Sequence, residues 1–474
     1  MTRSAWVWRV LAVLVALTVT ATLGYFITRI PIQLMDGGSN MIGVADTGPW
    51  QLFIEKMTQG GFFRPLMWPP YRLVMDWSGG AYFAWFKTIH VVQVFVLLLV
   101  FARLLRVENA TDLTAFGFAV AVLVGGHTFP GTVREAFPIN HFLSVAICTL
   151  GVVVLAAEPR RLINDVLAIL LFVYATLTLE SGLLVWVAVT WAWWLGWRGV
   201  SRSAVGAITV GVAAYMVLRF GWFDVGLPGL IERASGFGFV RLEGDELQRR
   251  FGSGPLLFYV YNVFSALLSL LFAEPRAGVY SFVRGLVRGS QEPWTLLNVI
   301  CAAGVTVLVA LAFWHRRGIW RDDLSHHDRL LAMMPVLVVA NSVFCYVYLK
   351  DVVLSVAGIF VAAAAYVAMR DTLSSFTGLR WRLTSVVAAM ALTVLSAAWS
   401  VKFIGIHYSI RKESIAVRKE WAQVDGWLAR EGSALNTPAK RSVKGLLEMD
   451  ALRRQPVAPW PALPWSVDWF DETQ

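Results

Sequence analysis

Charged residues are scarce in this sequence. Only 15% of its 474 residues are Asp, Glu, Lys or Arg, whereas 57% are hydrophobic. Soluble domains carry about 25% charged residues, so the composition excludes an ordinary water-soluble protein. Many apolar runs approach the length of about 20 residues that a helix needs to cross a bilayer. The sequence therefore predicts an integral membrane protein.

Cysteines and repeats are also few. The three cysteines, Cys148, Cys301 and Cys345, all lie inside apolar runs. Their odd number and positions favour packing roles over a disulfide framework or a thiolate metal site. No pattern calls for a cofactor, and a metal is neither implied nor excluded. No repeat with a period of about 20 to 50 residues is visible, which argues against an appended solenoid.

The fold class that we predict is all-α: a polytopic transmembrane bundle of about eleven helices, or about twelve if residues 255–273 also cross. Arg3 and Arg9 precede the first apolar run as in a signal peptide, but no clean cleavage site follows, so we interpret this run as the first span. The predicted spans are 6–28, 82–105, 114–130, 139–157, 164–180, 182–197, 204–221, 294–314, 330–348, 352–370 and 384–404.

The basic loops predict the orientation of the chain, because short cytoplasmic loops are rich in Lys and Arg. Eleven spans place every basic loop inside, whereas a full span at 255–273 would move the last three outside. We therefore expect a re-entrant or interfacial helix there. The net charge of +10 reflects these loops and does not indicate nucleic-acid binding. The basic loops are RLLR, EPRR, WRGVSR, HRRGIWR and RDTLSSFTGLRWR.

This topology predicts a transmembrane domain over residues 1–404 and a short outer tail over 405–474. The domain includes a long amphipathic outer loop at 29–81 and an outer region at 222–293. We expect a multi-pass protein of a bacterial inner membrane whose active site lies on the periplasmic or extracellular face, where most of the ionisable residues outside the basic loops gather.

The first outer loop holds two candidate catalytic carboxylates, Asp36 and Asp46. A carboxylate near a bound hydroxyl accepts its proton as a new bond forms. The alternative is a solvated turn residue. Further along, GGFFRPLMWPPYRLVMDW contains Arg64, whose guanidinium beside Pro65 suits bidentate phosphate binding. Asp76 ends the same segment and is a supporting residue.

Other outer polar residues follow. His90 and Gln93 lie three residues apart on one face of a predicted helix, although a buried and satisfied histidine is the alternative. Glu180 interrupts an apolar run and either serves the site or marks a turn. We expect donor phosphate to contact Arg64, His90, His127 and Arg134, with support from Asp76, Gln93, Glu135, Asn140 and Glu180.

These motifs together resemble membrane glycosyltransferases of the GT-C fold. The similarity rests on an Asp after the first helix, FRPL, the IHVVQ helix, the turn HTFPGTVREAFPINH, LTLESGLLV and CYVYLKD. It is greatest to transmembrane O-mannosyltransferases that bear tetratricopeptide repeats, and it covers most of residues 1–200 and part of 335–370. The chain departs from their motifs at three positions: Gly37 stands in place of the second Asp, Leu179 in place of a Lys, and Cys345 in place of an Arg. The His and Pro that are adjacent in those motifs are separated here, in HTFP, and the repeats are lacking.

The resemblance implies an enzyme of the hexosyltransferase kind. It would move a sugar from a polyprenyl-phosphate donor to the hydroxyl of a glycan, lipid or protein acceptor, among membrane lipids. A polymerase or ligase of cell-surface glycans is an alternative with similar hydropathy. A transporter is less favoured, because it would place paired polar residues near helix midpoints.

Overall fold

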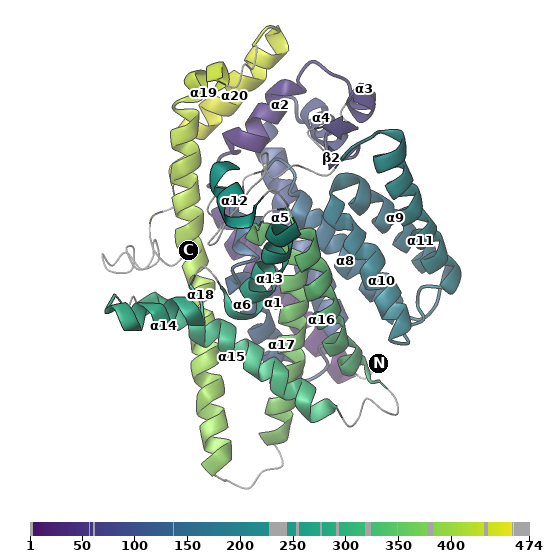
Figure 1. Cartoon of the computed structure of the whole chain (residues 1–474), viewed down its shortest axis with the longest axis vertical. Helices are drawn as coiled ribbons and strands as arrows, with labels where there is room; N and C mark the ends of the chain where they lie inside the picture. The colour runs from purple at the N-terminus through teal and green to yellow at the C-terminus, as the bar shows by residue number, and fades with distance from the viewer. Residues whose placement is uncertain are drawn as a thin grey trace.

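The computed structural model of the chain is built almost entirely from helices (Figure 1), so the predicted all-α class is confirmed. It describes residues 3–55, 57–59, 62–135, 137–226, 244–252, 256–274, 277–290, 293–317, 324–347, 349–376, 383–430, 435–456 and 458.

The amino-terminal half alternates long apolar helices with short helices of the first loop. Its elements are α1 (Arg3–Ile27), η1 (Leu34–Gly38), α2 (Ser39–Gly43), α3 (Pro49–Glu55), β1 (Thr58–Gln59), β2 (Phe62–Phe63), α4 (Pro69–Ser78), α5 (Tyr82–Leu105), α6 (Ala110–Gly125), α7 (Pro130–Arg134), α8 (His141–Ala157), α9 (Leu162–Thr178), η2 (Glu180–Leu183), α10 (Leu184–Trp194), α11 (Arg202–Met216) and η3 (Val217–Trp222). The two strands pair antiparallel, Thr58 with Phe63.

The carboxy-terminal half ends in one very long helix and two short ones. Its elements are α12 (Gly244–Phe251), α13 (Leu256–Phe272), α14 (Val279–Arg288), α15 (Pro293–Arg316), α16 (His326–Phe344), η6 (Asp351–Leu354), α17 (Ser355–Phe376), α18 (Leu383–Trp421), α19 (Val424–Arg430) and α20 (Pro438–Arg453). Helix α18 continues unbroken through the predicted boundary at residue 404.

Several helices are long and apolar enough to span a membrane, which supports a multi-pass integral membrane protein. Within the described residues there are six such helices, or up to seven if the bent pair α12–α13 forms one span. The predicted spans at 114–130, 139–157 and 164–180 correspond to the shorter apolar helices α6, α8 and α9. The remaining predicted spans overlap the long helices or the helices α10 and α16, and the total of about eleven stays a prediction.

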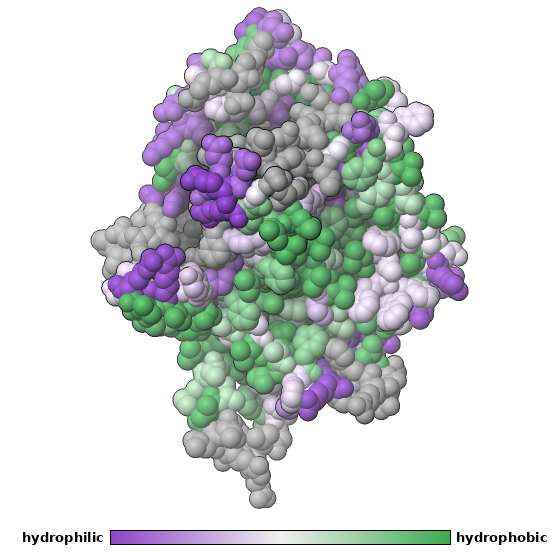
Figure 2. All heavy atoms as spheres, in the orientation of Figure 1, coloured by the Kyte–Doolittle hydropathy of each residue, from purple (hydrophilic) through white to green (hydrophobic). Residues whose placement is uncertain are grey.

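The stretch 255–273, for which we expected a re-entrant or interfacial helix, forms α13. It follows α12 at an angle of 89°, a geometry that fits either a broken span or a re-entrant loop. Exposed side chains on α13 include Leu257, Phe264 and Leu268. Figure 2 shows hydrophobic side chains over the middle of the molecule, where Figure 1 places α13, as expected for a helix that faces lipid.

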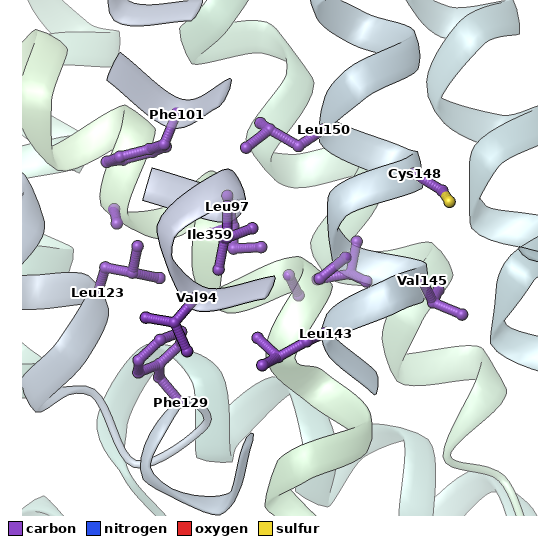
Figure 3. Packing of buried hydrophobic residues seen from close by; sticks show 14 of the residues in the cluster. Val94, Leu97, Phe101, Leu123, Phe129, Leu143, Val145, Cys148, Leu150 and Ile359 are labelled. Carbon is purple, nitrogen blue, oxygen red and sulfur yellow. The ribbon is translucent and has the colours of Figure 1, made fainter. Parts of the chain in front are cut away.

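The core centres on α17. The apolar 18-residue stretch of the candidate span that contains α17 is 83% buried, whereas the corresponding stretches of the spans that contain α11, α15 and α18 are at most 28% buried. Helix α17 packs against α6, α15 and α16. Figure 3 shows side chains from several helices meeting in this region, including Val94 and Leu97 of α5 and Ile359 of α17. The central helix therefore packs on protein, while the three others face outward.

The first loop and the tail pack together at one end of the molecule (Figure 1, top). The indole Nε1 of Trp421 donates to the Ile32 carbonyl over 2.6 Å, and Ser414 Oγ donates to the Arg29 carbonyl over 2.9 Å. Lys440 of α20 lies 3.4 Å from the Asp46 carboxylate. The tail therefore forms one face with the loop that holds the predicted site residues.

Candidate functional site

A pocket of about 270 Å³ lies where β2, η2, η3 and the end of α16 meet. Most of its wall is aromatic or aliphatic, and its charged lining residues among those described are two arginines and one glutamate. The lining residues are Phe62, Arg64, Phe142, Leu179, Glu180, Ser181, Leu183, Tyr215, Met216, Arg219, Phe220, Phe344, Tyr346, Val347 and Val353.

Arg64 and Glu180, both predicted from the sequence, meet in this pocket. Arg64 donates to Glu180 Oε2 from Nε over 2.9 Å and from Nη2 over 2.7 Å. The guanidinium also stacks over the Phe62 ring, 3.9 Å from its centroid. The Leu66 amide donates to the Leu177 carbonyl over 3.0 Å, which ties the Arg64 segment to the end of α9. The two side chains are about one-fifth exposed, so solvent and ligands can reach them.

Arg219 is a third charged residue of the pocket and was not among the predicted site residues. It lies in η3, only 7% exposed, with Nη1 3.5 Å from Glu180 Oε1. The same nitrogen donates to the Tyr215 hydroxyl over 3.1 Å. Each Glu180 oxygen thus faces one arginine, and the cluster carries an excess positive charge. An arginine inside the apolar run 204–221 was the available signal, because such residues at membrane depth are costly without a role.

The turn that carries Glu180 depends on a glycine. A Cβ on Gly182 would lie 2.2 Å from the backbone carbon and oxygen of Ala175, a separation that no side chain tolerates. Its amide donates to the Leu179 carbonyl over 2.9 Å. The chain therefore folds tightly back on α9 after Leu179, and this close contact fixes the position of Glu180 at the pocket wall.

His90, Gln93 and Asn140 form a buried network instead of lining the pocket. The Thr132 carbonyl accepts from His90 Nε2 over 2.8 Å and from Asn140 Nδ2 over 2.5 Å. Gln93 Nε2 donates to the Asn140 carbonyl over 3.1 Å. His90 and Asn140 are fully buried. The observed bonds join α5, α7 and the start of α8. Among the described residues His90 Nδ1 is buried without a hydrogen-bond partner, so only one of its two ring nitrogens is satisfied.

We expect Asn140→Ala to destabilise the protein by about 3 kcal/mol. Asn140 caps α8 by accepting from the Leu143 amide over 3.0 Å, and its removal leaves that buried donor unpaired. Asn109 caps α6 through the Asp112 amide in the same way but is exposed, so Asn109→Ala should cost only about 1 kcal/mol. Equilibrium unfolding in mixed micelles compares the two, and equal losses would contradict a special role of the buried network.

His127, Arg134 and Glu135 each join the turn to a different element. His127 Nε2 lies 2.9 Å from Ser269 Oγ of α13. Arg134 Nε lies 3.6 Å from Glu413 of α18. Glu135 pairs with Lys350 at 2.9 Å, a lysine of the motif CYVYLKD that was not among the predicted site residues. Of that motif, Tyr346 lines the pocket and Tyr348 lies outside the described residues.

The loop carboxylates are not pocket lining residues in the described part of the chain. Asp76 pairs with Arg72 one turn earlier in α4, at 2.7 Å. Burial raises the pKa of Asp46, but hydrogen bonds from its own backbone and from Lys440 outweigh this, so the pKa lies below its ordinary value. Asp46 is therefore ionised at neutral pH. Asp36 belongs to η1, and its side chain lies outside the described residues.

The pocket can hold a ligand with an anionic group and an apolar part. Its arginines offer donors to an anion, and its aromatic walls offer apolar contact. Among the residues that the structure describes, no three His, Cys, Asp or Glu side chains gather as metal ligands would. No protein-family model matches the chain, and neither a curated protein nor a solved structure is significantly similar to it.

Proposed function

We propose that this protein is a membrane glycosyltransferase with a GT-C-like bundle that takes a sugar from a polyprenyl-phosphate carrier. The observation that supports this most is the pocket in which Arg64, Glu180 and Arg219 meet an apolar wall. A polyprenyl phosphate has the same two parts, an anionic phosphate and an isoprenoid chain. The resemblance of the sequence motifs to such transferases points in the same direction.

In the proposed reaction the oxygen of an acceptor hydroxyl attacks the anomeric carbon of the donor sugar. The bond between that carbon and the phosphate oxygen breaks, and its electron pair leaves with the polyprenyl phosphate. Arg64 and Arg219 oppose the negative charge that develops on the leaving oxygen. The hydroxyl proton passes to a carboxylate, for which Asp36 is the first candidate and Asp46 the second.

Glu180 has a positioning role in this scheme. Both of its oxygens face guanidinium groups, one from Arg64 and one from Arg219. It holds Arg64 and Arg219 at the pocket before the donor arrives. When a phosphate binds, it pairs with the excess positive charge of the cluster, so the side chains of Arg64, Glu180 and Arg219 need not move far.

Binding of the carrier alone tests the donor assignment. We expect the purified protein to bind a polyprenyl phosphate about 10- to 100-fold more tightly than the matching polyprenol, because the phosphate adds charge-assisted hydrogen bonds to arginine. The measurement is a titration in nanodiscs that follows the quenching of intrinsic tryptophan fluorescence by brominated ligands. Equal affinities for the two ligands would refute a phosphate site in this pocket.

A further inference from the structure

Helix α14 presents an apolar face that the described residues cover only in part. None of its ten residues is buried. Its exposed side chains include Val283 at 50%, Leu286 at 56% and Val287 at 83%. At helical spacing these three, with Val279 and Phe282, share one side of the helix. Figure 2 shows this side as a green patch along the lower edge of α14.

The opposite side of α14 is basic. Arg284 and Arg288 are one turn apart, both exposed, and Ser281 lies beside them on the helical wheel. Figure 2 shows a hydrophilic area directly above the apolar patch. Neither arginine has an ion-pair partner among the residues that the structure describes. The helix therefore separates apolar and cationic side chains cleanly.

The turn before α14 fixes the direction in which the helix projects. Glu274 is only 8% exposed, and its carboxylate accepts from the Tyr280 amide in the first turn. A Cβ on Gly278 would lie 2.1 Å from the Phe272 carbonyl oxygen and 2.7 Å from the Glu274 carboxyl group, so the turn is tightly packed. In Figure 1, α14 lies across α18 instead of along it.

In the sequence, helix α14 comes just before a candidate membrane span. It ends at Arg288, and the candidate span Trp294–Arg316 of α15 begins a few residues later. That span ends at the basic sequence HRRGIWR, which the positive-inside rule places in the cytoplasm. The start of α15, and α14 with it, therefore belongs at the outer surface of the membrane.

We propose that α14 lies in the outer membrane interface and binds anionic phospholipids. Its apolar face enters the boundary between headgroups and acyl chains, while Arg284 and Arg288 contact headgroup phosphates. An amphipathic helix with arginines on its polar face has the chemistry of such an interfacial element. This proposal does not depend on the reaction that the pocket carries out.

Two arguments favour lipid over a second copy of the chain as the occupant of this face. A stable dimer needs roughly 800 Å² from each partner, far more than one face of a ten-residue helix offers. A symmetric contact through α14 would also bring four exposed arginines close together, which repel each other.

Site-specific fluorescence tests the proposal on the full chain. The three native cysteines are buried, so a fluorophore can be attached selectively to Val287→Cys or, on the polar side, to Arg284→Cys. In bilayers that contain phospholipids brominated on their acyl chains, we expect the label at position 287 to be quenched at least several-fold more than the label at 284. Equal weak quenching would place both faces in water and overturn the proposal.

The lipid preference is measured with the label at position 287. We expect α14 to prefer brominated phosphatidylglycerol to brominated phosphatidylcholine by about fivefold for each arginine that contacts a headgroup. Arg284→Gln with Arg288→Gln should abolish this preference while leaving quenching by acyl chains in place. An unchanged preference in the double variant would refute the headgroup contacts. Self-quenching of the label that rises with protein density in the bilayer would instead assign the face to a second copy.

Discussion

Arg64→Lys is expected to slow sugar transfer by about a hundredfold without preventing membrane insertion. Arg64 gives two hydrogen bonds to one Glu180 oxygen, and a lysine keeps the charge but loses the planar fork that makes this geometry possible. The variant should raise KM for the polyprenyl-phosphate sugar more than KM for the acceptor. The measurement is the release of polyprenyl phosphate by protein reconstituted in liposomes.

A matched control separates this effect from general damage. Arg103 pairs with Glu158 at 2.9 Å, but its side chain is 64% exposed and lies outside the pocket. Arg103→Lys should therefore leave transfer at the parental rate. If Arg64→Lys also keeps the parental rate and donor KM, Arg64 acts only as an anchor of the first loop, and the phosphate assignment must be abandoned.

Asp36→Asn should reduce turnover by roughly 10²- to 10⁴-fold, the usual cost of losing acid–base help. The amide is nearly isosteric but takes no proton at neutral pH, so donor binding should change little. Asp36 follows the predicted first span within eight residues, at the surface where a lipid-linked sugar and a water-borne acceptor would meet. Turnover and donor affinity are compared for Asp36→Asn, Asp46→Asn and the parent in one lipid composition.

The two carboxylates give distinguishable results. Asp46 lies 3.4 Å from Lys440 of the tail, so Asp46→Asn should mainly loosen the contact between loop and tail. Loss of turnover only in Asp46→Asn would transfer the general-base role to that residue. Full turnover in both variants would refute a general base in the first loop and would direct attention to the pocket itself.

The membrane character and the helical class could be predicted because both depend on local composition. Runs such as 82–105 and 294–314 are apolar enough to predict α5 and α15 almost residue by residue. Hydropathy did not predict that α17 is central while α15 is peripheral. Lipid and protein interior are equally apolar, so a buried helix and a lipid-facing helix have similar sequences.

The candidate site shows the same division. Arg64 and Glu180 could be selected from the sequence because each interrupts an apolar context in a turn-like segment. Their pairing across 116 residues could not be predicted, since it depends on the packing of the Arg64 segment against the end of α9. His90 had a plausible functional spacing with Gln93, yet in the folded chain it is buried in the core and its Nε2 donates to the Thr132 carbonyl.

The sequence by itself determined that the chain is a helical membrane protein and which of its loops carry basic residues, because hydrophobic length and charge act over short stretches. Only the tertiary structure decided that Arg219 joins Arg64 and Glu180, and that the tail covers the first loop. Both contacts connect segments far apart in the chain, and their geometry follows from how whole helices pack, which no local pattern specifies.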